Sequence, residues 1–410
     1  MAIIVPFKAL RPQPQSAKQV ASKPYDVLNS AEARKETQGN PISFLHITKS
    51  EIDLPDGIDV YSKDVYEKAK ENLHAFTQRD VLFREEKPCY YIYQLVMGGR
   101  SQTGLVCGSS VDDYENDVIK KHEFTRPDKE LDRINHIKTT GAQTGNVFLA
   151  YKSVGAIDEV IEKWKKTHHP VYDFKAADGV SHTIWIVNED ATITLITELF
   201  KNQVPVTYIA DGHHRAASAA KVRQALGDKA TEGSNYFLTT LFPSDQLQIM
   251  DYNRVVKDLN GLSEEEFVSR LSDDFIVQRS VTPVSPPKLH EFGLYLNKQW
   301  YLLQAKEGTY SDDPIGVLDV TILQNNVLDK LLGIKDQRTD KRIDFVGGIR
   351  GLGELEKRVN SGEMAVAFSL HPVSIQQLFD IADSGNVMPP KSTWFEPKLR
   401  DGLLTHLIYE

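Results

Sequence analysis

The sequence predicts a mixed α/β protein with a substantial share of antiparallel sheet. Apolar residues alternate between helical and strand spacing along the whole chain, without a low-complexity tract or an internal repeat. Short polar turns join pairs of strand-like runs, as in antiparallel hairpins. The 410 residues are 40% hydrophobic and 26% charged, which is typical of globular proteins and excludes disordered and collagen-like classes.

In the first part of the chain, alternation predicts strands and the 3.6-residue period predicts helices. A helix is expected to start at an N-cap at Ser30, with Glu32 in its first turn. Residues 61–78 place Val65, Ala69, Leu73 and Phe76 at helical spacing. The expected strands are 3–7, 44–48 and a hairpin of 90–97 with 103–109, turned through Gly98 and Gly99.

In the second part of the chain, strand and helix patterns continue to alternate up to about residue 255, and a different arrangement follows. The expected elements are a strand at 147–151, a helix at 155–167, a hairpin of 170–174 with 181–187, a helix at 190–202 and a strand at 204–210. Beyond about residue 255 the pattern indicates a smaller α+β unit with a hairpin near 290–304 and a helix at 318–332. We therefore expect an α/β domain over 1–255, which carries the candidate active site. A smaller α+β domain over 256–410 would include a lid-like loop around 389–398.

Net charge and cysteine content exclude several classes of function. Forty-eight basic and 57 acidic residues give 48 − 57 = −9, which argues against a dedicated nucleic-acid binder but leaves small anionic ligands open. Two cysteines without a Cys-x-x-Cys spacing predict neither a disulfide framework nor a cysteine zinc site. No apolar run approaches the roughly 20 residues of a membrane span, and the start lacks a secretory pattern, so a cytoplasmic protein without a membrane partner is expected.

The strongest local signal is the segment Asp211-Gly212-His213-His214-Arg215, where a short apolar strand ends and an alanine-rich helix begins. Glycine lets the backbone approach a ligand, and the N–H groups of a helix start favour an anion such as phosphate. Arg215 offers a planar fork to phosphate oxygens, and the histidines offer donors or proton transfer. Asp211 would serve as a magnesium ligand, a general base or a brace of the loop. The alternative is a plain turn with an Asp cap and surface histidines.

A second candidate segment surrounds the sequence His122-Glu123-Phe124-Thr125-Arg126-Pro127. Proline fits the first position of a helix, so the preceding residues lie in a loop that feeds a second helix start. Thr125 and Arg126, with Arg133 in the helix, could contact an anion, and Glu123 could act as a base or a metal ligand. The alternative is a solvated charged helix.

Weaker candidates are distributed along the rest of the chain. They are Arg11, Tyr25 and Asp26 in N-terminal loops, Asn253 and Arg254 at the end of an expected strand, and Lys391 in the rigid 389–398 loop. Ordinary turn chemistry accounts for the N-terminal group equally well. The chain has no Gly-x-Ser-x-Gly elbow and no Walker loop, which disfavours α/β-hydrolase and P-loop kinase chemistry.

These segments together resemble the bacterial family catalogued as domain of unknown function 1015, along nearly the whole chain. The resemblance depends on motifs such as Pro24-Tyr25-Asp26-Val27, Lys121-His122-Glu123-Phe124-Thr125, Tyr252-Asn253-Arg254 and Met388-Pro389-Pro390-Lys391-Ser392-Thr393. It implies no reaction by itself.

A narrower resemblance covers about twenty residues around Asp211–Arg215. This stretch is similar to the phosphate-binding turn of the ParB/sulfiredoxin superfamily, whose free-serine kinases carry an Asp-Gly-His-His-Arg stretch. Histidine replaces the catalytic cysteine of sulfiredoxins, and the helical DNA-binding domain of ParB is not found, which leaves the kinase branch. The resemblance implies a ParB/sulfiredoxin-like phosphate-binding core with a second, smaller α+β lobe, and the family's gene neighbourhoods favour serine metabolism.

The leading hypothesis is a nucleotide-dependent phosphotransferase acting on L-serine or O-phospho-L-serine, with Mg²⁺ and ATP or ADP. Glu123, His122, Asp211 and His214 are the candidate catalytic residues, and Asp211 is also the candidate metal ligand. The candidate phosphate- or substrate-binding residues are Arg11, Tyr25, Asp26, Thr125, Arg126, Arg133, Gly212, His213, Arg215, Asn253, Arg254 and Lys391. A phosphoserine phosphatase-like hydrolase and a non-catalytic binder of a phosphorylated metabolite remain alternatives, and a homodimer is left open.

Overall fold

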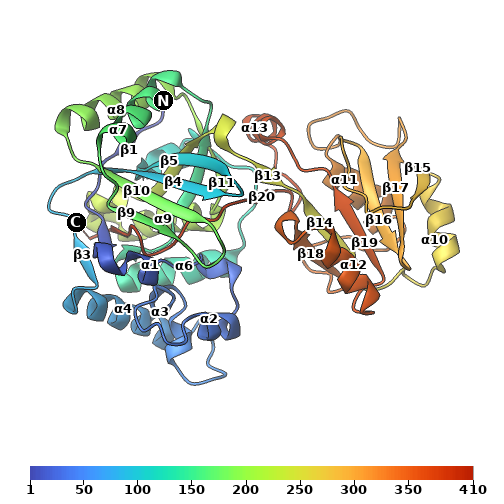
Figure 1. Cartoon of the computed structure of the whole chain (residues 1–410), viewed down its shortest axis with the longest axis horizontal. Helices are drawn as coiled ribbons and strands as arrows, with labels where there is room; N and C mark the ends of the chain where they lie inside the picture. The colour runs from blue at the N-terminus through green and yellow to red at the C-terminus, as the bar shows by residue number, and fades with distance from the viewer. Residues whose placement is uncertain (410) are drawn as a thin grey trace. The chain divides into compact units, whose positions relative to one another are not determined.

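The computed structural model describes residues 1–409 and divides into two compact units (Figure 1). Unit 1 comprises Met1–Leu247 together with the C-terminal segment that begins at Pro397, and unit 2 comprises Gln248–Glu396. The expected boundary near residue 255 differs from this division in two ways. Residues 252–256 form a strand inside the sheet of unit 2, and the last residues of the chain return to unit 1.

Unit 1 is built around a nine-stranded mixed sheet in the order β6-β11-β8-β12-β5-β4-β10-β9, with β1 paired to β5. Its strands are β1 (Ile4–Val5), β4 (Tyr90–Met97), β5 (Arg100–Ser110), β6 (Ile119–Lys120), β8 (Val147–Tyr151), β9 (Tyr172–Lys175), β10 (Ser181–Val187), β11 (Thr207–Asp211) and β12 (Tyr236–Pro243). The β11–β6 and β12–β8 pairs are parallel and the other pairs are antiparallel. Two small ladders join β2 (Leu10–Pro12) to β3 (Leu82–Arg84) and β7 (Ala142–Gln143) to β21 (His406–Leu407).

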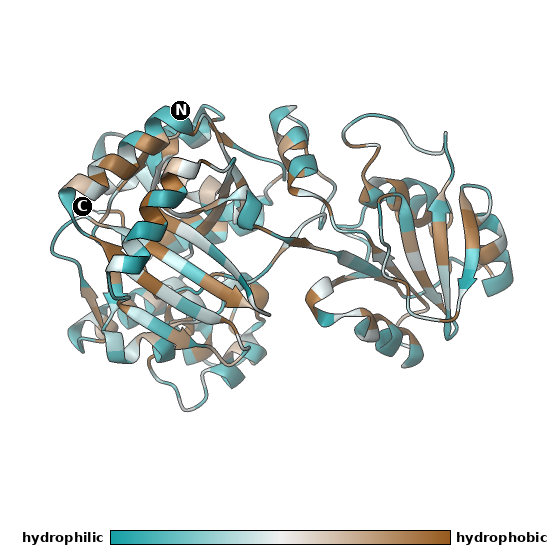
Figure 2. Cartoon of the chain, turned by 45° about the horizontal axis from the view of Figure 1, so that its top comes forward, coloured by the Kyte–Doolittle hydropathy of each residue, from teal (hydrophilic) through white to brown (hydrophobic). Residues whose placement is uncertain are grey.

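The helices of unit 1 bury apolar stripes against this sheet and against one another. They are α1 (Ala17–Val20), α2 (Ser30–Glu36), α3 (Leu45–Thr48), α4 (Lys63–Gln78), α5 (Val111–Glu115), α6 (Pro127–Thr140), α7 (Gly155–Thr167), α8 (Asp190–Gln203) and α9 (His213–Leu226). Apolar residues of α7, α8 and α9 share one core cluster with the central strands. Figure 2 shows hydrophobic colour along the strands and on the helix sides that face them.

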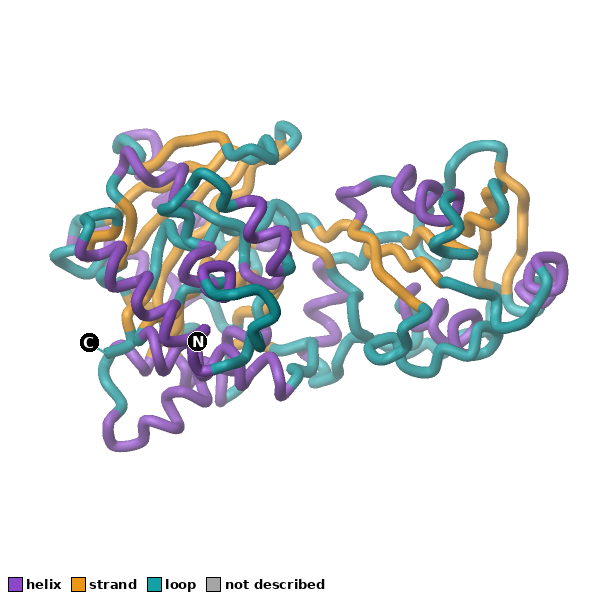
Figure 3. Tube along the Cα trace, turned by 90° about the horizontal axis from the view of Figure 1, so that it is seen from below, coloured by secondary structure: helices purple, strands orange, loops and turns teal. Residues whose placement is uncertain are grey.

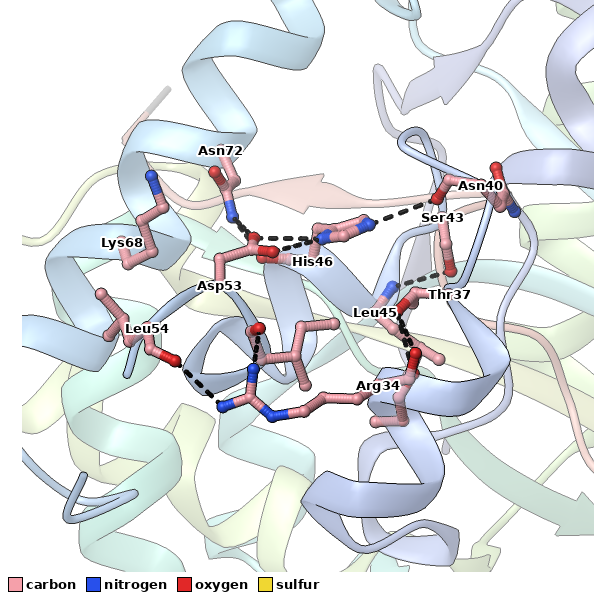
Figure 4. A network of polar contacts seen from close by, with 12 residues as sticks. Arg34, Thr37, Asn40, Ser43, Leu45, His46, Asp53, Leu54, Lys68 and Asn72 are labelled. Carbon is pink, nitrogen blue, oxygen red and sulfur yellow. Dashed lines mark hydrogen bonds and ion pairs between the residues drawn. The ribbon is translucent and has the colours of Figure 1, made fainter. Parts of the chain in front are cut away.

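A polar network joins the short N-terminal helices of unit 1 (Figure 4). Arg34 on α2 donates to the carbonyl oxygens of Glu51 and Leu54, each at 3.0 Å. The Nδ1 atom of His46 lies 2.8 Å from Asp53, whose other oxygen accepts from Asn72 at 2.7 Å. The hydrogen bond from Asp53 raises the pKa of His46. These contacts orient α2, α3 and α4, and none of them includes a predicted site residue.

Unit 2 carries a six-stranded sheet in the order β15-β17-β16-β19-β14-β18, in which every pair is antiparallel. Its strands are β14 (Tyr252–Val256), β15 (Phe275–Ser280), β16 (Glu291–Leu296), β17 (Gln299–Ala305), β18 (Ile343–Gly347) and β19 (Val366–Leu370), and a short ladder joins β13 (Ile249–Met250) to β20 (Trp394–Phe395). Its helices are α10 (Glu264–Leu271), α11 (Asp319–Leu323), α12 (Leu352–Asn360) and α13 (Ile375–Asp383). Figure 3 shows the helices and strands of this unit in separate colours, and the core packs α10 and α11 against the sheet.

The mixed α/β class is confirmed, and most predicted elements agree with the structure within a few residues. The strand expected at 44–48 was wrong, because Phe44 is the N-cap of helix α3 and the other four residues form that helix. A short apolar run that is buried on all sides does not distinguish a strand from a helix by its periodicity. The cap of α2 is Asn29 rather than Ser30, in a capping box with Glu32. Within residues 1–409, no helix is long and apolar enough to cross a membrane.

Candidate functional site

The predicted phosphate turn forms between β11 and α9. Gly212 adopts φ +100°, which is the left-handed region that side chains disfavour, and helix α9 begins directly after it at His213. As the N-cap residue, Gly212 has no side chain to bond the first N–H groups of α9, so these groups and the positive end of the helix dipole lie at the turn without a side-chain cap. Ala216 and Ala219 then pack into the core of unit 1, which holds the helix start in place.

Replacing Gly212 with alanine is expected to destabilise unit 1 by about 1–3 kcal/mol and to weaken anion binding at the turn. The added Cβ would lie 3.4 Å from the guanidinium of Arg215 and from the backbone of Val147, at an unfavourable φ. Gly39→Ala is the matched control, because Gly39 has φ +76° with nothing within 4 Å of the added atom. Urea unfolding and phosphate titration check the result. Equal binding losses in both variants would contradict a role of the turn in anion binding.

Two histidine rings contact each other at the turn. His122 and His213 make an edge-on contact with ring centroids 4.5 Å apart, and they are only 2% and 5% exposed. Burial lowers the pKa of His122 to about 4 and lowers the pKa of His213 well below its usual value, so both rings are neutral near pH 7. His122 is therefore too buried to contact a substrate directly. Its ring lies against His213, where it can hold that ring in position.

Glu123 is the exposed acid of this group. Its Oε2 atom lies 3.6 Å from Nδ1 of His213, and its side chain is 44% exposed. Among the described residues, Nε2 of His213 has no hydrogen-bond partner. At the turn, the half-exposed carboxylate of Glu123 therefore lies beside the buried imidazole of His213, one nitrogen of which has no hydrogen-bond partner among the described residues.

The loop before α6 contacts the turn through the next histidine. The backbone N–H of Arg126 donates to Nε2 of His214 at 2.9 Å, which makes this nitrogen an acceptor in the neutral ring. Burial lowers the pKa of His214. Thr125 donates to Glu130, and Glu130 also binds Lys221. The hydroxyl of Thr125 is therefore already committed to α6, while the Arg126 side chain stays 61% exposed beside Asp128.

Arg215 points into the protein rather than out of the turn. It donates to the carbonyl of Asn146 and to Asp26 at 3.2 Å, and its Nη2 lies 3.8 Å from Asp211. Burial opposes its charge, but Asp26 and Asp211 hold the pKa of Arg215 above its usual value. Arg215 thus ties an N-terminal loop to the turn, across 189 residues of sequence.

Asp211 closes the strand with both of its oxygens engaged. Nζ of Lys398 lies 3.1 Å from Oδ2, and Arg215 approaches Oδ1. Burial works against ionisation, but Lys398 and Arg215 hold the pKa of Asp211 well below its usual range. The residues present do not fit a dedicated Mg²⁺ site, because this carboxylate already has two cationic partners. Within residues 1–409, no group of three or more His, Cys, Asp or Glu side chains could hold a metal ion. Asp211 acts here as a brace of the turn.

Tyr25 and Arg133 pack beside Arg215. The Arg133 guanidinium lies 3.9 Å from the ring centroid of Tyr25 and makes a 2.8 Å ion pair with Asp132. Burial raises the pKa of Tyr25 to about 12. Together with Arg215 they line a cavity of about 20 Å³, which is room for about one water molecule. This cavity is therefore too small for a phosphorylated ligand.

The C-terminal segment supplies site residues that the sequence reasoning missed. Besides Lys398, it brings in Asp401, which is 2% exposed and accepts from the backbone N–H of Asn146. Burial raises the pKa of Asp401 to about 7 although Arg215 and Arg133 are near. Backbone bonds between Ser22 and Asp401 in both directions hold the segment in place. The pattern of the 389–398 loop pointed to basic residues, but not to this site.

The remaining predicted residues are Arg11 in unit 1 and three residues of unit 2. Arg11 binds Glu85 at 2.5 Å and the hydroxyl of Tyr172 at 3.0 Å, and none of its contacts within residues 1–409 joins it to the turn. The other three lie in unit 2, namely Asn253, Arg254 and Lys391.

The sequence places Asn253 and Arg254 at the end of a strand, but in the structure they lie inside β14 and are fully buried. Asn253 donates to Asp251 at 2.5 Å, and Arg254 donates to the carbonyl oxygens of Tyr252 and Lys391. Burial lowers the pKa of Arg254 to about 10. Arg254 therefore has a structural role, because its hydrogen bonds hold the Pro390–Lys391 turn against β14. Lys391 is exposed, with its ammonium 5.8 Å from the Tyr252 ring centroid.

Comparisons with known proteins give one family and several weak structural likenesses. The family model described as "Protein of unknown function (DUF1015)" matches residues 4–321. No curated protein matches the sequence significantly. Similar solved structures include a free serine kinase in complex with AMP, at 14% identity and a TM-score of 0.37, covering 73% of this chain and 91% of that chain. A conserved hypothetical protein from Pyrococcus furiosus has 14% identity and a TM-score of 0.36, covering 74% and 95%.

A third structure is SbnI with a C-terminal truncation from Staphylococcus aureus, at 12% identity and a TM-score of 0.33, covering 74% of this chain and 87% of that chain. Likenesses of this size assign neither a ligand nor a reaction.

Proposed function

Since the chain belongs to the family described as "Protein of unknown function (DUF1015)", we propose an activity from the site of unit 1 itself. The site is that of a nucleotide-dependent phosphotransferase acting on a small hydroxy amino acid. L-serine or O-phospho-L-serine is the first candidate substrate, with ATP or ADP as the nucleotide. The choice of amino acid rests on the similarity of the Asp211–Arg215 stretch to free-serine kinases.

One observation carries the proposal, namely the uncapped start of α9 with Glu123 beside it. Phosphate is the anion that a glycine turn and a helix N-terminus bind best, because several N–H groups converge on its oxygens. Glu123 lies 3.6 Å from the first residue of this helix and is half-exposed, so it can reach a hydroxyl that approaches the bound phosphate. An anion site and a carboxylate base at one turn are what phosphoryl transfer to an alcohol requires.

The step follows from these positions. The hydroxyl oxygen of the amino acid forms a bond to the transferred phosphorus while the bond from phosphorus to the bridging oxygen of the nucleotide breaks. The hydroxyl proton passes to Glu123, and the shortened nucleotide leaves. The N–H groups of α9 and nearby cations offset the charge on the phosphoryl oxygens. Mg²⁺ would arrive with the nucleotide phosphates, because Asp211 is already engaged by Lys398.

The test is direct. Purified protein incubated with L-serine, Mg²⁺ and either ATP or ADP is expected to form O-phosphoserine, and His214→Ala is expected to slow this reaction. Formation of no O-phosphoserine, together with no effect of His214→Ala on nucleotide turnover, would overturn the proposal. Phosphate release from O-phosphoserine without nucleotide would identify a hydrolase instead. Thermal stabilisation by O-phosphoserine without any turnover would identify a binding protein.

A further inference from the structure

We propose, on the basis of the phosphotransferase function above, that Lys398 is the residue that contacts the transferred phosphate. Lys398 lies in the C-terminal segment, outside residues 4–321 that the family model matches. In the structure its Nζ lies 3.1 Å from Asp211, the residue directly before Gly212. The ammonium is therefore held next to the helix start where a phosphate would bind.

The C-terminal segment holds Lys398 in this position by several independent contacts. Arg400 binds Asp178, and its backbone N–H donates to the hydroxyl of Tyr93 at 3.3 Å. Asp401 exchanges backbone hydrogen bonds with Ser22, and Thr405 does the same with Leu10. The backbone around Lys398 is thus anchored, while its four-carbon stem lets the ammonium move by a few ångströms.

The arginines of the turn are less suited to this task. Arg215 is 8% exposed and is held by Asn146 and Asp26, and Arg133 is 8% exposed and is held by Asp132 and Tyr25. Moving either guanidinium outward would leave a carboxylate that it now neutralises. Since the buried histidines are neutral, a phosphate at α9 would be stabilised by a positive charge that can move toward it. Arg126 is exposed but pairs with Asp128, whereas Lys398 is held beside the residue that precedes Gly212.

Lys398 can supply that charge by exchanging partners. When a phosphate binds at α9, the ammonium turns from Asp211 toward the phosphate oxygens, and Arg215 remains to compensate Asp211 at 3.8 Å. The site also contains a buried nitrogen that a ligand could contact, because Nε2 of His213 has no hydrogen-bond partner within residues 1–409. When no phosphate is bound, the ion pair with the carboxylate of Asp211 would keep the ammonium of Lys398 at the turn.

The experiment compares Lys398→Met, Lys398→Gln and Lys398→Arg with the wild-type chain. Lys165→Met is the matched control, because Lys165 is also mostly buried in unit 1 and pairs with a carboxylate, Glu162, at 2.6 Å. The readouts are calorimetric binding of ADP, O-phospho-L-serine and inorganic phosphate, kcat and KM for the transfer, and urea unfolding without ligand.

We expect Lys398→Met and Lys398→Gln to weaken phosphate-ligand binding by at least about tenfold and to lower kcat by about 10²-fold. Lys398→Arg should recover part of both losses, and Lys165→Met should change neither. Turnover that is unchanged in Lys398→Met would overturn this inference alone. Equal losses in Lys398→Met and Lys398→Arg that follow a loss of stability would also overturn it, because they indicate a purely structural role. A wild-type chain that binds none of the three probes would overturn the proposed function as well.

Discussion

Glu123→Gln is expected to lower kcat for phosphoryl transfer by about 10²–10⁴-fold, because glutamine cannot accept the proton of the attacking hydroxyl. The side chain is 44% exposed, so the substitution removes little packing and should leave the folding free energy within about 0.5 kcal/mol of wild type. KM should change little, since the amide keeps the size of the carboxylate and one of its two acceptor oxygens. Steady-state kinetics with L-serine and nucleotide, together with urea unfolding, measure both effects.

The chain offers a close control for this variant. Glu189 lies 3.6 Å from Nε2 of His168 and is 59% exposed, so it repeats the distance and the exposed carboxylate of the Glu123–His213 pair away from the turn. Glu189→Gln should leave kcat unchanged. A Glu123→Gln protein with wild-type kcat would show that another group takes the proton.

Asp319→Asn is expected to stabilise unit 2 at pH 8 by up to about 4 kcal/mol while changing its stability little at pH 4. Asp319 is 3% exposed at the start of α11, and its Oδ1 atom accepts from the backbone N–H of His290 at 2.8 Å. Its other oxygen has no partner among the described residues. Burial, with a smaller contribution from Glu291, raises the pKa of Asp319 from 3.8 to about 7.

The direction of the pH effect follows from this raised pKa. Between about pH 4 and pH 7 the folded chain holds a proton that the unfolded chain has released, so the stability of unit 2 falls as the pH rises. The amide side chain carries no charge and removes this dependence. Urea unfolding at pH 4, 6 and 8 measures the stability, and hydrogen exchange of the β16 amides locates the change in unit 2. The exposed Asp312→Asn serves as control. A wild-type protein whose unit 2 does not lose stability over this range would contradict a buried, protonated Asp319.

Much of the fold followed from short-range patterns. The hairpin of β4 and β5, with positive φ at Gly98 and Gly99, and helix α7 from Gly155 to Thr167 agree with the sequence because turn chemistry and periodicity are local. The strand predicted at 44–48 was wrong because four of its five residues are buried, so the pattern does not distinguish a strand from a helix, and the helix that forms there packs against α4. The resemblance to the family catalogued as domain of unknown function 1015 is confirmed over residues 4–321, and the motif at 388–393 lies outside the matched residues.

The sequence by itself determined the two helix starts of the site. Gly212 before an alanine-rich helix and Pro127 at the first position of α6 dictate where each helix begins, whatever lies around them. The choice of partners was decided by the tertiary structure. Arg215 turned inward to Asp26, Lys398 came from 187 residues away to Asp211, and Arg254 was buried in unit 2. Charged side chains are placed by long-range burial and pairing, which local spacing does not encode.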